Sequence, residues 1–204
     1  TEVSLIGIGL GLTIIDAAGS PDGALTVHSG ARASLEGLTI RNAHGGQNDA
    51  VGCHSGTLEL DDVVVRDSST DNIGGAIYAE GCNLSLDRVQ LLDNSSAQGG
   101  GMYLRDCDSV IITATRISGN TATQGGGGIF SQSSVVTLAE SSLVGNDAGT
   151  NGGGGGIIQV GDTAMLVIDS SLIAGNRAVL EGGGIYAPVG RSLTLRNSTV
   201  SGNT

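Results

Sequence analysis

Apolar residues recur along this chain in a long period, without the spacing of an amphipathic helix. One apolar position returns in steps of 25, 26, 26, 26, 30 and 27 residues. Its members are Ile40, Val65, Leu91, Ile117, Leu143, Ile173 and Val200. The positions five and seven residues before each of these anchors are also apolar, from Leu35 and Ala33 to Leu195 and Leu193. This alternation predicts short strands, each with one buried face.

The segments between the anchors repeat as well. "GGAIYAEG" (74–81), "GGMYLRD" (100–106), "GGIFSQS" (127–133), "GGIIQVG" (155–161) and "GGIYAPV" (183–189) are copies of one motif. The five glycines at 152–156 occupy the slot of the glycine pair in the other copies. They therefore predict a turn with a local insertion and not a linker between two domains.

A repeat of 25–30 residues with about three short strands and no helical pattern indicates a solenoid of stacked coils. We predict an all-β fold, a parallel β-helix of about seven to eight coils with three short strands per coil. Each strand would pair with its equivalents one coil above and below, at about 4.8 Å. A leucine-rich repeat shares the length but needs its own Leu/Asn consensus, which this sequence lacks. Residues 1–204 are expected to form a single domain.

Asparagine marks one turn of the repeat. Five repeats carry it three residues after the anchor, at Asn94, Asn120, Asn146, Asn176 and Asn203. Stacked Asn side chains hydrogen-bond along the axis and satisfy the amides of turns. The first two repeats have Ala43 and Ser68 in this place, so the expected ladder is incomplete.

The charge of the chain limits its partners. The net charge is −11, and all nine basic residues are arginines. Nucleic acids and anionic membranes attract clusters of Lys and Arg, so both are disfavoured. No apolar run approaches the roughly 18 residues of a membrane span, so we expect no direct membrane insertion by this segment. "GIGLG" (7–11) leads into a β-type run instead of a helix, so we expect a turn there and no nucleotide or other cofactor.

All four aromatic residues directly follow the apolar residue of the glycine motif: Tyr78, Tyr103, Phe130 and Tyr186. Because side chains alternate along a strand, Ile77 and its equivalents should point inward and the rings outward. Two interpretations follow. The rings form a stacked ladder on the surface, or they form a stripe that binds sugars or a partner protein.

Two of the three cysteines share a place in the repeat. Cys82 and Cys107 both lie five residues after the apolar residue of the glycine motif, so they are expected to stack in adjacent coils. The coil spacing is compatible with a disulfide between them, and two buried free thiols are the alternative. Cys53 stands apart, and no zinc-binding spacing of Cys and His is present.

Three carboxylates fall in register, each one residue after the middle apolar position: Glu36, Asp61 and Asp87. Like charges one coil apart repel unless a cation, an arginine or solvent lies between them. Calcium sites and catalytic carboxylates are built from such groups. Acidic residues are equally ordinary in the turns of an acidic surface. We therefore assign no metal and no catalytic residue, and these three are where a cation would bind.

The repeated "GGGI" and "GGAI" motifs followed by "SGN" resemble those of bacterial extracellular right-handed parallel β-helix proteins. The chain is similar to the chlamydial polymorphic outer membrane protein type, whose motifs are GGA[ILV] and FxxN. Here Leu, Ile or Val stands three residues before the asparagine in place of Phe. The resemblance covers nearly the whole chain. It implies a right-handed coil, secretion or display on the bacterial cell surface, and a role in adhesion.

Two functions from different classes follow. The first is a non-catalytic extracellular β-helix, an adhesin or stalk that binds carbohydrate or a host or cell-surface protein. The second is a carbohydrate-active enzyme, a polysaccharide lyase or glycoside hydrolase. Ice binding would need flat columns of Thr, and the outward position before the anchor is too irregular for that. Because the sequence begins and stops inside the repeat, we expect a fragment of a longer array or end-to-end association through uncapped coils.

Overall fold

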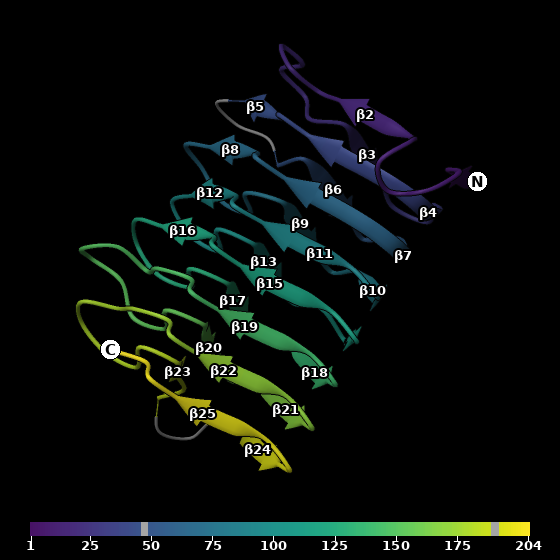
Figure 1. The fold of residues 1–204 in the computed structure, drawn as a ribbon. Coiled ribbons are helices and arrows are strands. Elements are labelled where there is room, and N and C mark those ends of the chain that lie inside the picture. The colour runs from purple at the N-terminus through teal and green to yellow at the C-terminus, as the bar shows by residue number, and fades with distance from the viewer. Residues whose placement is uncertain (46–48, 189–191) are drawn as a thin grey trace.

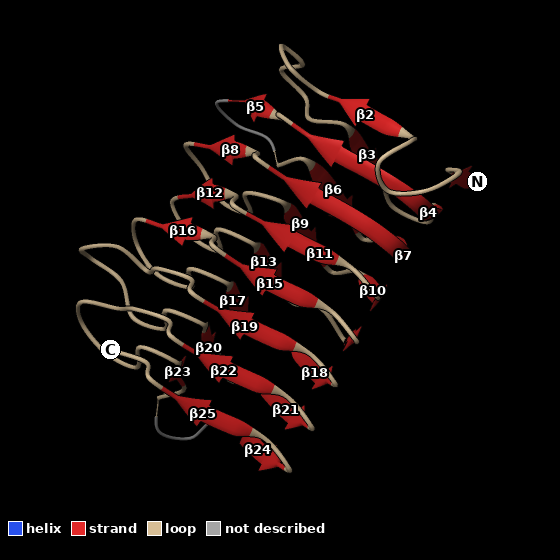
Figure 2. Cartoon of the chain, in the orientation of Figure 1, coloured by secondary structure: helices blue, strands red, loops and turns tan. Residues whose placement is uncertain are grey.

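The computed structural model describes residues 1–45, 49–188 and 192–204. In these residues the chain winds into a column of stacked coils, in which all regular elements are strands (Figures 1 and 2). All strand pairs are parallel. The N-terminus and the C-terminus lie at opposite ends of the column (Figure 1). The predicted parallel β-helix is confirmed, with about seven turns.

The strands line up in three sheets along the column. The 14-stranded sheet contains β1 (Glu2–Ile6), β2 (Ile14–Asp16), β4 (Arg32–Arg41), β7 (Thr57–Arg66), β10 (Asn83–Asp87), β11 (Gln90–Leu92), β14 (Ser109–Thr113), β15 (Arg116–Ser118), β18 (Val135–Ala139), β19 (Ser142–Val144), β21 (Met165–Asp169), β22 (Leu172–Ala174), β24 (Ser192–Arg196) and β25 (Thr199–Ser201). The seven-stranded sheet contains β3 (Leu25–Val27), β6 (Val51–His54), β9 (Ile77–Glu80), β13 (Met102–Arg105), β17 (Ile129–Gln132), β20 (Ile157–Val160) and β23 (Ile185–Tyr186). Two-residue strands form the third sheet: β5 (His44–Gly45), β8 (Ser69–Thr70), β12 (Ser95–Ser96) and β16 (Thr121–Ala122).

The strand register reproduces the period of the sequence. Ile40 pairs with Val65, Val65 with Leu91, and the series continues to Val200. The 30-residue step, however, contains two insertions and not one. Thr121 bridges to a residue 26 positions later, but Ile129 pairs 28 positions later, which places two extra residues near the glycine run. Val135 pairs with Met165, 30 positions later, so the other two inserted residues lie in the turn before β21.

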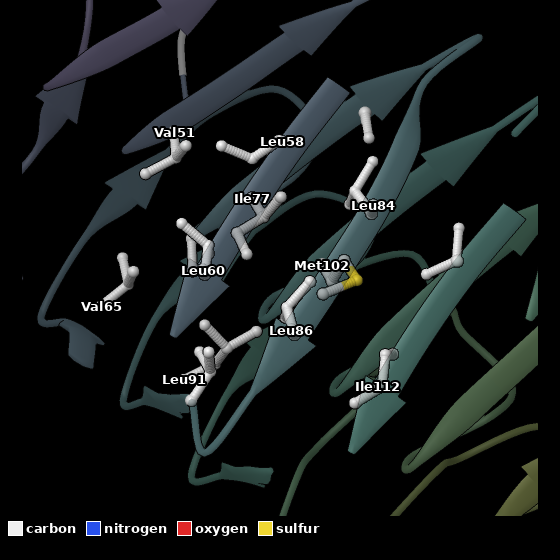
Figure 3. Close-up of a cluster of buried hydrophobic side chains, with 14 of the residues drawn as sticks. Val51, Leu58, Leu60, Val65, Ile77, Leu84, Leu86, Leu91, Met102 and Ile112 are labelled. Atoms are coloured by element: carbon white, nitrogen blue, oxygen red, sulfur yellow. The ribbon is translucent and has the colours of Figure 1, made fainter. Parts of the chain in front are cut away.

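The three apolar columns predicted from the sequence line the inside of the solenoid (Figure 3). Eighteen of the 21 residues are buried, and Leu86, Leu91 and Ile112 are among the fully buried ones. The other three are Leu193, Leu195 and Val200, which are exposed because they belong to the last coil and pack against a coil on one side only. The core is therefore a stack of aliphatic layers, held by the burial of apolar surface.

A buried asparagine ladder joins the coils at one corner. The Asn120 Oδ1 accepts hydrogen bonds from the backbone N–H and the Nδ2 of Asn94, both at 3.0 Å. The Asn120 Nδ2 donates to the Leu91 carbonyl and to Asn146 Oδ1, both at 3.0 Å. The same bonds continue through Asn176 to Asn203. Ser68 extends the ladder because its N–H donates to Asn94 Oδ1.

A second ladder at the neighbouring corner was missed by the sequence reasoning. Its members are Thr115, Ser141, Ser171 and Ser198, each two residues before an anchor. Each hydroxyl donates to the carbonyl two residues earlier and accepts a backbone N–H from the coil before it, as Ser141 does from Thr115 at 3.0 Å. The recurrence of Ser or Thr at this spacing was the available signal.

We expect Asn120→Ala to lower the free energy of unfolding by about 3 kcal/mol, because it leaves the buried backbone N–H of Asn94 without an acceptor and removes one hydrogen bond each from the Asn94 Nδ2 and the Leu91 carbonyl. Chemical denaturation monitored by circular dichroism measures this. Asn83→Ala, at an exposed asparagine that begins β10, is the matched control and should have little effect. Equal losses in the two variants would contradict a structural role for the ladder.

Candidate functional site

The aromatic residues form a column outside the seven-stranded sheet. Tyr78 pairs in register with Tyr103, and Tyr103 with Phe130. Their rings stack at centroid distances of 5.8 and 5.0 Å, with planes 8° and 12° apart. The rings point away from the aliphatic core, as strand alternation predicts, and form a separate apolar cluster with Ile158 and Tyr186. The column is therefore a ladder of stacked rings.

The expectation that this ladder lies on the surface is wrong, because Tyr78, Tyr103 and Phe130 are buried. The glycine turns fold over them. Gly126 has a φ of 64°, and a Cβ at this position would lie 2.8 Å from the Cβ of Phe130. Gly154, in the glycine run, lies in the same way over Ile158. The faces of the Tyr103 ring stack against its two neighbours, so a sugar cannot stack on it, and only Tyr186 is partly exposed.

Polar side chains cap the hydroxyl edge of this ladder. The Tyr78 hydroxyl donates a hydrogen bond to Glu80 Oε2 at 2.8 Å, and Arg105 pairs with the same carboxylate. The His54 Nδ1 lies 4.0 Å from Glu80 Oε2, and its ring packs against Tyr78 at 5.2 Å. The Tyr78 hydrogen bond, followed by Arg105, holds the pKa of Glu80 below its usual value. Burial raises the pKa of Tyr78, and the hydrogen bond to Glu80 adds to this effect.

Asp49 fills a gap in the aromatic column. Gly52 pairs in register with Tyr78, so this coil has no side chain at the position of the aromatic column. Instead the Asp49 Oδ2 lies 2.8 Å from the place where a Gly52 Cβ would be. The carboxyl accepts the backbone N–H of Tyr78, but burial outweighs this bond and raises its pKa to about 7. Tyr78 therefore contacts two carboxyl groups whose proton affinities are shifted in opposite directions. The sequence reasoning missed Asp49, because the equivalent position is a glycine in the next coil, Gly75, and in the coils that follow, so no acidic column marks it.

The carboxylates Glu36, Asp61 and Asp87 stack in register on the 14-stranded sheet, as the spacing predicts. Arg88 follows Asp87 in the chain and forms ion pairs with both Asp61 and Asp87. The positive charge of one arginine thus compensates the repulsion between two coils. Within the described residues, no group of three or more His, Cys, Asp and Glu side chains is arranged to hold a metal ion.

We therefore expect millimolar calcium to leave the melting temperature unchanged within error, because Arg88 already occupies the space between the carboxylates. Replacing Arg88 with Gln should create a calcium response, since the carboxylates then lack their counter-charge. Differential scanning calorimetry with and without calcium measures both. A rise of several degrees in the unmodified protein, abolished by Asp61→Asn, would overturn this assignment.

Both alternatives for Cys82 and Cys107, a disulfide between them or two free thiols, are wrong. Cys82 is bonded to Cys53, with the Cα atoms 6.3 Å apart, and Cys107 is a buried free thiol. Cys82 and Cys107 do stack, since they follow the paired residues Glu80 and Arg105 by two positions. The bond instead runs diagonally to the preceding coil. The residue equivalent to Cys53 in the next coil is Ala79, so Cys107 has no diagonal partner.

A shallow groove of about 370 Å³ crosses the coils along the sheet of short strands. Hydroxyl side chains from three coils line it: Thr70, Ser95, Ser96, Thr121 and Thr123. Asp71 and Asp147 stand among them, and Asp147 pairs with Arg177 at 3.0 Å. The groove therefore combines hydrogen-bonding groups with apolar surface, to which Ala97 contributes, and this suits a ligand that has hydroxyl groups as well as apolar faces.

The comparison with protein families matches the right-handed beta helix region over residues 51–204. The chain belongs to the right-handed β-helix family. Members of this family occur among surface proteins and among enzymes that act on polysaccharides. Comparisons of this β-helix with curated proteins and with solved structures found no match. Within the described residues of the β-helix, no helix is long and apolar enough to cross a membrane.

Proposed function

We propose that this β-helix is a non-catalytic module of an extracellular or cell-surface protein, an adhesin or stalk. The observation that carries the proposal is the axial continuity of the side-chain ladders, which join every coil from Ser68 to Asn203 at one corner. Such ladders hold the coils in one arrangement, as a rigid spacer requires. The Cys53–Cys82 disulfide supports an oxidising compartment outside the cytoplasm.

The hydroxyl-lined groove is the proposed binding surface, and carbohydrate is the ligand class that its chemistry favours. We expect the intact protein to bind a subset of immobilised glycans without cleaving them. Thr121→Arg places a bulky cation in the groove and should weaken this binding, whereas Thr113→Arg, on the 14-stranded sheet, should not. Binding on a glycan array, with analysis of the same glycans for cleavage products, tests the proposal. Accumulation of cleavage products would overturn it.

The second candidate function, a carbohydrate-active enzyme, is favoured by one observation. Asp49, with a pKa of about 7, and Glu80, held ionised, both contact Tyr78. Two carboxyl groups with opposed pKa shifts are the arrangement of a general acid and an ionised partner in glycoside hydrolysis. If this function is correct, a polysaccharide panel will yield new reducing ends, and Asp49→Asn will abolish them while the fold is retained. A panel without products counts against this second candidate.

A further inference from the structure

Three cysteines lie in consecutive coils around one corner of the solenoid. Cys82 is bonded to Cys53 in the coil before it. In the coil after it, the Cys107 thiol accepts the backbone N–H of Cys82 and lies 3.6 Å from the Ala79 carbonyl. Stacked residues of adjacent coils are about 4.8 Å apart, within the Cα range of disulfides. Cys82 therefore has a sulfur neighbour on both sides, one diagonal and one vertical.

The corner itself does not require sulfur at Cys107. The backbone N–H of Cys107 donates to the Ser134 hydroxyl at 3.0 Å, and that hydroxyl donates to the Gln132 carbonyl at 2.9 Å. Cys107 has the same two bonds one coil earlier, to Cys82 and to the Arg105 carbonyl. A serine thus fills this structural role in the next coil. What Cys107 adds is a thiol beside a disulfide.

We propose that Cys82 exchanges disulfide partners between Cys53 and Cys107, so that the covalent bond between coils moves by one coil. In this step the Cys107 thiol loses its proton to solvent, and the thiolate attacks the Cys82 sulfur. The Cys82–Cys107 bond forms as the Cys53–Cys82 bond breaks, and Cys53 leaves as a thiolate that takes up a proton. The number of disulfides is unchanged, so no oxidant or reductant is consumed.

The pKa of the Cys107 thiol determines the rate of the exchange, and the lengths of the closed loops affect its equilibrium. Burial raises the pKa of the Cys107 thiol, so little thiolate is present in the closed fold at neutral pH. Opening of this corner, or alkaline solution, should therefore accelerate the exchange. The two bonds close loops of similar length, because the sequence separation is 29 residues for Cys53–Cys82 and 25 for Cys82–Cys107. Chain entropy consequently favours neither strongly.

Peptide mapping distinguishes the two bonds directly. Trypsin cleaves after Arg41, Arg66, Arg88, Arg105 and Arg116, which places each cysteine in its own peptide: 42–66, 67–88 and 106–116. The unmodified protein is held in mild denaturant at about pH 9, above the ordinary thiol pKa, then alkylated at intervals and digested. We expect 67–88 joined to 106–116 to appear with time, as the alkylated Cys53 peptide appears in equal amount.

The Cys53→Ala variant isolates the vertical pair. After oxidation with oxidised glutathione it should lose both free thiols and yield peptide 67–88 joined to 106–116. Cys82→Ala is the matched control and should keep two thiols, since Cys53 and Cys107 are two coils apart. Cys107→Ser should keep the Cys53–Cys82 bond unchanged. If Cys53→Ala keeps two thiols, or if it does not fold and the unmodified protein yields no 67–88/106–116 product, the proposal is wrong.

Discussion

Replacing Ile112 with Asp is expected to lower the free energy of unfolding by about 5 kcal/mol or more, because it places a charge inside the aliphatic stack. Ile112 is fully buried and pairs in register with Leu86 and Leu138 on the inner face. No polar group of these columns is available to compensate the carboxylate. A melting temperature lower by more than about 10 °C, or loss of the β-sheet circular dichroism signal, is the expected result.

The preceding residue supplies a matched control for this prediction. Ile111 has the same side chain in the same strand, but it points outward and is 48% exposed. Its partners in register are Ser85 and Thr137, so a new carboxylate there meets solvent and no paired acid. Ile111→Asp should change the melting temperature by at most a few degrees. Similar decreases in melting temperature for the two variants would contradict the assignment of Ile112 to the inner face and Ile111 to the outer face of β14.

The sequence was sufficient for the parts of the fold that repeat. The apolar columns and the asparagine positions recur with a fixed period, so stacking one coil on the next places each member in register. The apolar columns predicted the core, because a strand with period-two alternation has only one apolar face to bury. The stacking of the carboxylates of Glu36, Asp61 and Asp87 was predictable from the same periodicity.

Apart from the ladder of Ser and Thr hydroxyls, which does repeat, the features that were not predicted depend on contacts between non-equivalent positions. Cys53 reaches Cys82 diagonally, and a comparison of equivalent positions finds only the vertical neighbour, Cys107. The aromatic ladder is buried because the glycine turns before each strand fold back over it, a packing that strand alternation does not describe. The aromatic column has Gly52 in register with Tyr78, and the space that a side chain at Gly52 would take is filled by the side chain of Asp49, three residues earlier in the chain.

Asp49→Asn is expected to stabilise the protein at pH 8 by as much as about 4 kcal/mol, or about 10 °C in melting temperature. The pKa of Asp49 is about 7 in the fold, against about 3.9 in an unfolded chain. The folded state therefore binds the proton more tightly. The stability that protonated Asp49 contributes is fully present below about pH 4 and is lost as the pH rises through about 7. Asparagine is uncharged at every pH and keeps an oxygen that can accept the Tyr78 N–H.

Melting curves of both proteins between pH 5 and pH 8 measure the effect as a difference, in which the contributions shared by the two proteins largely cancel. The stabilisation by Asp49→Asn should grow from pH 5 to about pH 7 and then level off toward pH 8. The reason is that the carboxyl is already ionised in the unfolded chain throughout this window, but ionises in the fold only as the pH passes about 7. Asp108→Asn, at an exposed residue of the turn before β14, is the matched control and should give a flat difference. A flat difference for Asp49→Asn as well would mean that its carboxyl is solvated, and the assignment of a buried acid beside Tyr78 would then be abandoned.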